Sequence, residues 1–161
     1  LAQALGQALS PGFVHVAKET VAPCTWNAST IAWPMALAQP HLAKGASVIN
    51  FSSITRFNGP EEMSTYVATK AGAIGLSRSL ARELGSRRIR VNTISPGWIM
   101  TDRQLDEHVT PAIKRELRKI QCIPDLNQPD EVADVALFLA SDASRAVTGQ
   151  DILGDRGWRH G

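Results

Sequence analysis

The chain has 161 residues, of which 43% are hydrophobic, and its formal net charge at pH 7 is +2. A chain of this length can bury one hydrophobic core, so we expect a single domain. The small net charge argues against a nucleic-acid partner, and no uncharged run is long enough to span a bilayer, so we expect no membrane association.

The first predicted elements are a short helix, a strand and a second helix. Leucines recur at four-residue spacing over residues 1–9, which indicates one amphipathic helix. Residues 13–17 predict a strand. Residues 28–42 predict a helix, in which Pro34 favours a kink or a late start.

Residues 46–53 are an apolar run with β-branched side chains, which predicts a buried parallel strand. Ser53 stands at the carboxyl end of this strand, where an open α/β sheet presents groups to a ligand. A serine hydroxyl at a strand end more often bonds to the local backbone, so its position alone does not predict a function.

The strongest predicted helix covers residues 66–84 and ends at Gly85. Tyr66 and Lys70 are four residues apart, so the helix places a phenol and an ammonium on one face. A nearby cation favours the phenolate, which suits the pair to proton transfer. Taken alone, such a pair is more often part of a solvated helix surface. The helix also carries small residues, namely Ala68, Ala71, Gly72 and Gly75, and apolar residues for packing, namely Ile74, Leu80 and Leu84.

The rest of the chain predicts strands that alternate with helices. Residues 89–95 are a second apolar strand, which stops at a Pro-Gly pair. The Thr-Pro pair at residues 110–111 favours a helix start, and residues 130–141 carry apolar side chains at helical spacing. Residues 147–153 predict a turn and a last short strand. Together these elements predict an α/β fold.

From about residue 27 to residue 158 the chain resembles the short-chain dehydrogenase/reductase family. Ser53, Tyr66 and Lys70 match that family's catalytic serine, tyrosine and lysine in order and spacing, and Asn27 is similar to its catalytic asparagine. The resemblance implies a partial doubly wound, Rossmann-like parallel sheet that lacks its N-terminal βαβ unit. The cofactor-binding residues that it implies are Tyr66, Lys70, Pro96, Gly97, Ile99 and Thr101, the last four within a segment similar to the family's P-G-x-x-x-T motif.

The resemblance also implies a mechanism. Tyr66 would exchange a proton with a substrate hydroxyl or carbonyl while hydride passes to or from a nicotinamide. Lys70 would favour the phenolate and hydrogen-bond the nicotinamide ribose, and Ser53 would hold the substrate oxygen. Asn27 would place a water that links Lys70 to solvent. The implied cofactor is NAD or NADP. The resemblance does not distinguish them, because the deciding residue follows the second strand of the family's N-terminal half, which the resemblance does not cover.

Two features depart from the family pattern. No glycine-rich phosphate-binding turn is found, since the close pair Gly72 and Gly75 lies inside the predicted helix of residues 66–84. We therefore expect residues 1–26 to be an atypical N-terminal segment and residues 27–161 to be the C-terminal part of a single dinucleotide-binding domain. Arg156 replaces a glycine in the family's ending, at a cost of about 1 kcal/mol or more if that position requires positive φ.

The substrate and the partners stay open at this stage. Residues 96–104 are similar to the branch of the family that oxidises aldoses and polyols. Arg103 and Gln104 suit a hydroxyl-rich substrate, or they are solvated residues of a substrate-covering segment. The resemblance implies that this segment includes the helix after Thr110. A 3-oxoacyl thioester is the alternative substrate. A catalytically inactive remnant that associates through the helix of residues 66–84 is the alternative function, and an intact enzyme of this type would be a homo-oligomer.

Cysteine and histidine usage completes the predictions. The two cysteines are isolated, which favours a reducing cytoplasm, and the four histidines form no metal-ligand pattern. We therefore predict no metal site.

Overall fold

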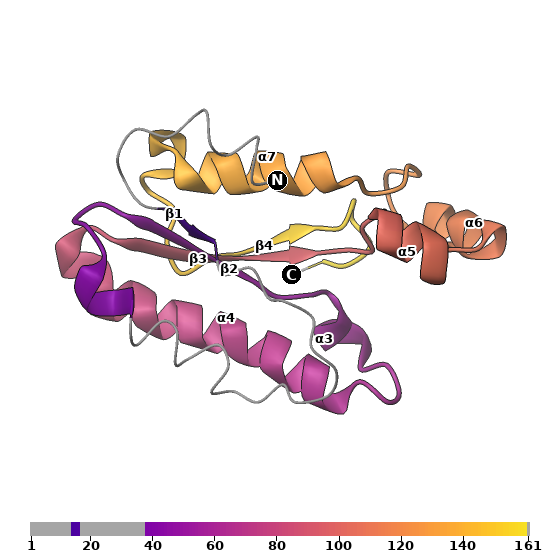
Figure 1. The fold of residues 1–161 in the computed structure, drawn as a ribbon, viewed down its shortest axis with the longest axis horizontal. Coiled ribbons are helices and arrows are strands. Elements are labelled where there is room, and N and C mark those ends of the chain that lie inside the picture. Colours follow the sequence, from indigo (N-terminus) through magenta and orange to yellow (C-terminus); the bar gives the residue numbers. More distant parts are fainter. Residues whose placement is uncertain (1–13, 17–37, 161) are drawn as a thin grey trace.

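The structure is a computed structural model that describes residues 14–16 and 38–160. It contains one parallel sheet in which the strands stand in sequence order (Figure 1). The strands are β1 (Val14–Val16), β2 (Ser47–Phe51), β3 (Arg90–Pro96) and β4 (Asp151–Gly154). The predicted parallel α/β fold is confirmed.

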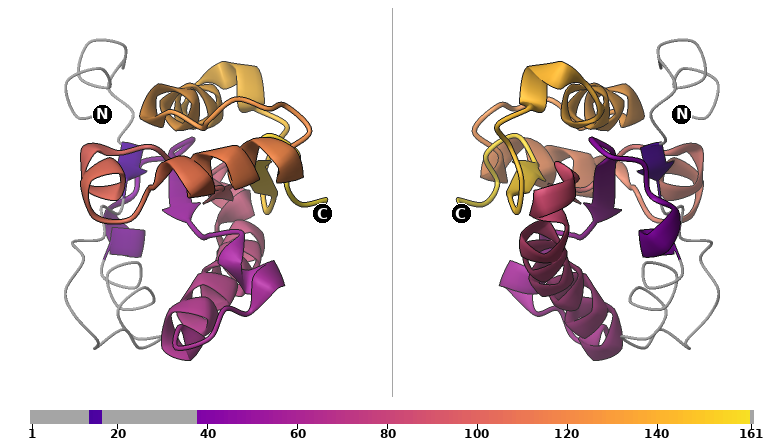
Figure 2. Two further views of the ribbon diagram at one scale, coloured as in Figure 1. Left: turned by 90° about the vertical axis from the view of Figure 1, so that its right-hand side faces the viewer. Right: turned by 90° about the vertical axis from the view of Figure 1, so that its left-hand side faces the viewer.

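Helices cover both faces of the sheet, as a doubly wound fold requires. The long helix α4 lies on one face and α7 on the other, while α5 and α6 lie beyond the carboxyl ends of the strands (Figures 1 and 2). The helices are α3 (Thr55–Asn58), α4 (Ser64–Leu84), α5 (Asp102–Glu107), α6 (Pro111–Ile120) and α7 (Pro129–Ala140), and the 3₁₀ turns are η1 (Gln39–His41), η2 (Gly85–Arg87) and η3 (Asp142–Ser144).

The side chains of β2 and β3 alternate between the two layers of the core. Val48 and Val91 pack with the buried residues of α4, whereas Ile49 and Ile94 pack with those of α7. All four side chains are at most 1% exposed. Strands that are buried on both faces carry the continuous apolar runs that the sequence shows.

A buried polar contact fixes how α4 sits on the sheet. Ser77, at 1% exposure, accepts hydrogen bonds from Asn50 Nδ2 of β2 at 2.8 Å and from Thr93 Oγ1 of β3 at 2.9 Å. Its own hydroxyl donates to the carbonyl of Ala73 one turn earlier at 2.8 Å. Because three partners converge on one oxygen, a small rotation or slide of α4 would leave buried polar groups unpaired.

Most of the predicted elements agree with the structure to within a few residues. The strand predicted at residues 13–17 is confirmed as β1, and Thr110 caps α6 by accepting the N–H of Ile113 at 3.3 Å. The helix predicted at residues 28–42 lies mostly outside the described residues, and its described end is the 3₁₀ turn η1. The short helices α3 and α5 were not predicted, because four and six residues are too few to show a period.

Arg156 has a φ of 57°, so the position where the family has glycine is in the left-handed region. Its guanidinium forms ion pairs with Glu131 and, at 3.7 Å, with Asp125. The backbone N–H of Gln128 and then the Arg156 guanidinium hold the pKa of the Glu131 carboxyl below its usual value. These contacts offset part of the backbone strain.

Of the helices in the described part of the chain, none combines the length and the apolar character that a bilayer crossing requires.

Replacing Ser77 with alanine tests whether this contact seats α4. We expect Ser77→Ala to lower the free energy of unfolding by about 1–3 kcal/mol, because Asn50 and Thr93 lose their common acceptor. Urea denaturation measures this change. Ser79→Ala removes an exposed hydroxyl of the same helix that bonds Glu83, and should change stability by less than about 0.5 kcal/mol. Equal effects of the two substitutions would contradict the role of Ser77.

Candidate active site

Ser53 and Lys70 both lie at the carboxyl end of β2, and Tyr66 lies beside Lys70 on α4. Ser53 follows the strand by two residues, and Tyr66 and Lys70 lie in the first two turns of α4. Both are on the side of α4 that carries Ser77, since residues four, seven and eleven apart share a helix face. Tyr66 is half-buried and Lys70 is 5% exposed.

Contacts with the strand fix the position of Lys70. Its Nζ donates to the carbonyl of Phe51 at 3.3 Å, and the hydroxyl of Ser52 donates to the carbonyl of Lys70 at 2.8 Å. The same Nζ lies 5.4 Å from the centroid of the Tyr66 ring, within the range of a cation–π contact. An ammonium that is buried this deeply needs such partners, and they hold it beside the phenol.

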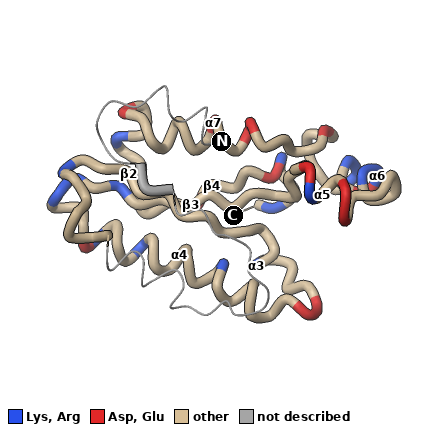
Figure 3. Tube along the Cα trace, in the orientation of Figure 1, with Lys and Arg blue, Asp and Glu red and all other residues tan. Residues whose placement is uncertain are grey.

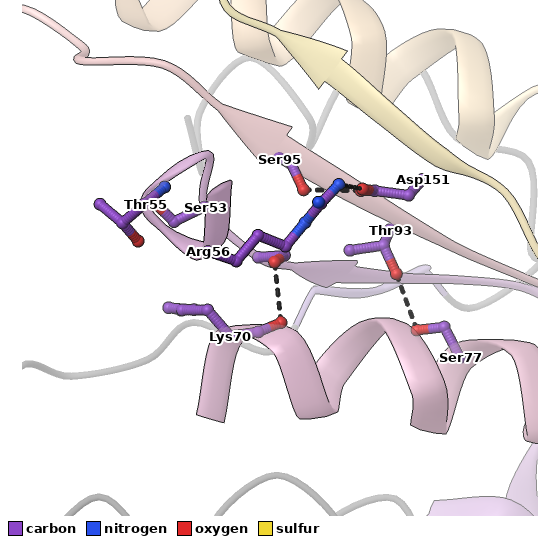
Figure 4. Close-up of polar contacts among 9 residues, drawn as sticks. Ser53, Thr55, Arg56, Lys70, Ser77, Thr93, Ser95 and Asp151 are labelled. Atoms are coloured by element: carbon purple, nitrogen blue, oxygen red, sulfur yellow. Dashed lines mark hydrogen bonds and ion pairs between the residues drawn. The ribbon is translucent and has the colours of Figure 1, made fainter. Parts of the chain in front are cut away.

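Ser53 keeps a donor available for a ligand. Its Oγ accepts the N–H of Thr55 at 3.2 Å, so one of its two lone pairs is used while the hydroxyl proton is available to donate. Figure 4 shows Ser53 on the turn after β2 and Lys70 on α4. The local backbone bond that the sequence suggested for such a serine is present, and it leaves the hydroxyl proton available.

The segment after β3 is held against the end of β4. Gly97 donates its N–H to the carbonyl of Gly154 at 3.0 Å, and the N–H of Ile54 bonds the carbonyl of Pro96 at 3.3 Å. A Cβ on Gly97 would lie 2.7 Å from Asn127 Nδ2 and 3.0 Å from the Cα of Asp155. Close packing therefore requires glycine here.

Thr101 caps α5 and, like Ser53, keeps its proton. Its Oγ1 accepts the N–H of Gln104 at 3.3 Å, and its backbone N–H bonds the carbonyl of Ile99 at 2.9 Å. Ile99 in turn pairs with Asn127 in a parallel bridge. Both Ile99 and Thr101 are thereby fixed at the end of the sheet.

A cleft of about 580 Å³ joins Ser53 to this second segment. One of its lining groups, Thr55 Oγ1, is buried without a hydrogen-bond partner. Tyr66 and Lys70 are not among the described residues that line it. Of the three predicted residues Ser53, Tyr66 and Lys70, Ser53 is therefore the one that lines the cleft. The lining residues are Ser53, Ile54, Thr55, Asn58, Met63, Gly97, Trp98, Ile99, Thr101, Gln104, His108 and Trp158.

The remaining residues predicted from the sequence lie at different places relative to the cleft or outside the described residues. Asn27 lies outside the described residues. Gln104 lines the cleft, where its Oε1 accepts from Trp98 Nε1 at 2.8 Å, whereas Arg103 is exposed and pairs with Glu107 at 2.9 Å. Within the described ranges, no three His, Cys, Asp or Glu side chains gather as metal ligands would.

Several lining residues were not found from the sequence. Trp158 reaches the cleft because β4 ends beside β3, and His108 reaches it from the end of α5. Asn58 ends the short helix α3. Neither spacing nor composition indicates these positions, since only the meeting of strand ends brings them together. Among the described lining residues, Gln104 belongs to α5 and none belongs to α6, the helix that the sequence suggested as part of a substrate-covering segment.

Comparison with known proteins identifies the family. A family model described as enoyl-(acyl carrier protein) reductase matches residues 5–159. A crystal structure described as a short-chain dehydrogenase/reductase, glucose/ribitol dehydrogenase, from Brucella melitensis superposes with a TM-score of 0.74 at 29% identity, over 81% of this chain and 52% of that one. The chain belongs to the short-chain dehydrogenase/reductase family.

Members of the short-chain dehydrogenase/reductase family with different names are similar to this chain. A 3-oxoacyl-(acyl-carrier-protein) reductase of Chlamydia trachomatis is 42% identical over 71% of this chain and 46% of its own length. A probable galactose dehydrogenase of Rhizobium meliloti is 41% identical over 73% and 47%, and a D-xylose 1-dehydrogenase of Caulobacter vibrioides is 42% identical over 71% and 46%. The chain thus spans about half the length of the curated short-chain dehydrogenases/reductases that it matches.

Replacing Gly97 with alanine tests the packing of the second segment. We expect Gly97→Ala to lower the free energy of unfolding by about 1–3 kcal/mol, because the new methyl overlaps the backbone of Asp155. Thermal unfolding monitored by circular dichroism measures the change.

The matched control is Gly72→Ala on α4, where an added Cβ has no neighbour within 4 Å. This substitution should raise stability by about 0.5–1 kcal/mol, because alanine favours a helix over glycine. A Gly97→Ala protein as stable as the unaltered chain would contradict the close packing.

Proposed function

We propose that this chain is, or is part of, an NAD(P)-dependent oxidoreductase that transfers hydride between a nicotinamide and a hydroxyl or carbonyl carbon of a small molecule. The observation that carries the proposal is the buried Lys70 ammonium, which is held between the Phe51 carbonyl and the Tyr66 ring at the strand end that also presents Ser53. A phenol, a cation and a hydroxyl in this order are the groups that a coupled proton transfer needs.

Each group has a distinct task in this proposal. The Tyr66 phenol gives a proton to a carbonyl oxygen during reduction or takes it from a hydroxyl during oxidation. Lys70 stabilises the phenolate through its charge. Ser53 donates its hydroxyl proton to the substrate oxygen and so holds it toward Tyr66. Asn27 is proposed to place the water through which Lys70 exchanges protons with solvent.

The residues present suit the nicotinamide end of a dinucleotide, which when bound supplies or accepts the hydride. Thr101 has a hydroxyl proton to donate, and the buried Thr55 Oγ1 lacks a partner in the cleft. Lys70 and Tyr66 lie on α4 and are not among the described residues that line the cleft. NAD and NADP both remain candidates. The proposed binding residues are Tyr66, Lys70, Pro96, Gly97, Ile99 and Thr101.

The lining of the cleft favours a sugar or polyol as the substrate. Two indole rings, Trp98 and Trp158, offer apolar faces to the C–H surface of a pyranose, while Asn58, Gln104 and His108 offer amide and imidazole groups to its hydroxyls. Two of the similar proteins are named as galactose and xylose dehydrogenases. A 3-oxoacyl thioester is the second candidate, favoured by the name of the Chlamydia trachomatis relative.

The two isolated cysteines favour a reducing compartment such as the cytoplasm.

Replacing Tyr66, the only tyrosine of the chain, tests the proposal directly. We expect Tyr66→Phe to lower the rate of hydride transfer by about 10²–10⁴-fold, because the proton-transfer group is lost. The rate is followed as NADH or NADPH absorbance with D-xylose, D-galactose and a 3-oxoacyl thioester. Quenching of tryptophan fluorescence by NADH and NADPH should saturate equally in both proteins, since Trp98 lines the cleft and the substitution removes only the phenolic oxygen from the ring.

Ser79→Ala, on the exposed side of the same helix, is the control and should keep the full rate. A Tyr66→Phe protein with an unchanged rate would contradict the assignment. No quenching of the unaltered chain at millimolar cofactor would rule out cofactor binding by this chain alone.

The outer face of α4 supports association with a second copy. Its small residues, namely Ala68, Ala71, Gly72 and Gly75, are exposed rather than packed on the sheet, and an added Cβ at either glycine meets no atom within 4 Å. These small residues therefore do not serve to let α4 lie close on its own sheet. A smooth helix face of this kind lets another helix approach closely. We propose that the copies of an intact enzyme associate here.

A bulky side chain at Gly72 tests this association. We expect Gly72→Trp to reduce the oligomeric state, because the indole prevents close approach of two helices, and light scattering after gel filtration measures the mass. Ala112→Trp places the same side chain at an exposed position of α6 and should leave the mass unchanged. Equal masses for the Gly72→Trp protein and the unaltered oligomer would contradict the interface.

A further inference from the structure

A buried ion pair joins the turn that carries Ser53 to the last strand. Arg56 of α3 pairs through Nη2 with Oδ2 of Asp151, the first residue of β4, and Ser95 of β3 donates to Oδ1 of the same carboxylate at 2.6 Å. The Arg56 and Asp151 side chains are only 17% and 6% exposed, and Ser95 is 0% exposed. Figure 4 shows the Arg56 side chain crossing from α3 to the carboxylate, with Ser95 beside it.

This contact supplies support that α3 lacks on its own. The helix has four residues, its N-cap residue Ile54 makes no side-chain capping bond, and a helix this short is not stable without tertiary contacts. The Arg56 guanidinium also stacks 3.6 Å from the centroid of the Phe57 ring, which fixes its plane. Its Nε is buried without a partner, so the side chain is held there at some cost in desolvation.

The same turn orients the Ser53 hydroxyl. The backbone N–H of Thr55 donates to Ser53 Oγ at 3.2 Å, and the N–H of Arg56 donates to the Ser53 carbonyl at 3.5 Å. The intervening Ile54 bonds the carbonyl of Pro96 at 3.3 Å. Backbone hydrogen bonds therefore connect Ser53 to Arg56, whose guanidinium pairs with Asp151.

We propose that Arg56 is a positioning residue for the reaction: paired with Asp151 and Ser95, it holds the turn of residues 53–56 so that the Ser53 hydroxyl faces the cleft. This inference rests on the proposed oxidoreductase function, in which Ser53 holds the substrate oxygen. A buried ion pair often adds little to stability compared with apolar residues of similar size, whereas its geometry is specific. The pair is therefore expected to matter for the rate more than for folding.

A double substitution separates an effect of the ion pair on the reaction rate from an effect on folding. Arg56→Met with Asp151→Asn removes both charges together, and the asparagine amide oxygen can still accept from Ser95, so neither an unpaired charge nor an unpaired hydroxyl is left buried and the protein should fold with stability close to that of the unaltered chain. We expect kcat for hydride transfer to fall by at least about tenfold, because a displaced catalytic group slows the reaction strongly. The KM for the nicotinamide cofactor should stay within about twofold, since Ser53 acts on the substrate oxygen. Arg56→Lys with Asp151 intact should recover part of kcat.

The control is Arg145→Met, which removes an exposed guanidinium that donates to the backbone carbonyl of Asp142 at 3.4 Å, and should leave kcat unchanged. A wild-type kcat in the folded double variant overturns the proposal. So does a loss that Arg56→Lys does not restore at all, because that result assigns the effect to altered packing.

Amide hydrogen exchange provides a readout that does not require activity. In the double variant the amides of Ile54 and Thr55 should exchange at least about tenfold faster, while that of Thr93 in β3 keeps its protection. If the unaltered chain transfers no hydride, this chain alone is not the active enzyme, and the exchange result decides whether Arg56 holds the turn. Unchanged exchange at Ile54 and Thr55 overturns the positioning role.

Discussion

Ser77 accepts one hydrogen bond from Asn50 of β2 and another from Thr93 of β3, and this contact determines how α4 is placed on the sheet. Because the helix cannot rotate without breaking these bonds, the face that carries Ser77 also directs Tyr66 and Lys70 toward the carboxyl end of β2. Lys70 then meets the Phe51 carbonyl. A structural contact in the core thus decides where the reactive groups lie.

The parallel sheet brings the other half of the site to the same edge. The turn after β2 and the segment after β3 both leave the sheet at its carboxyl end, where Ile54 bonds Pro96 and Gly97 bonds Gly154. Charged residues mark the outer elements here, with both signs on α5 and α6 and acidic residues alone on the turn before α4 (Figure 3). The cleft itself is lined mainly by aromatic, aliphatic and neutral polar side chains, which suits an uncharged substrate better than a strongly acidic one.

The sequence predicts the regular part of this molecule because local patterns determine it. The apolar runs of β2 and β3, the length of α4 and the Thr110 cap of α6 are properties of neighbouring residues. The spacing of Ser53 to Tyr66 and Lys70 is such a local pattern too, and it predicts the catalytic set that we propose. The place of Trp158 in the cleft and the ion pair of Arg56 with Asp151 depend on which strand ends meet. Arg56 and Asp151 are separated by 95 positions in sequence, and no local pattern contains that information.

The central claim is that Ser53 and Tyr66 form one catalytic unit because α4 is fixed beside β2. A double-mutant cycle on the rate of hydride transfer, with Ser53→Ala, Tyr66→Phe and both together, tests it most directly. Residues that act as a unit have strongly non-additive effects, so the double variant should lose about as much rate as the more impaired single variant. Losses that multiply would show that the two residues act independently, and would contradict the account.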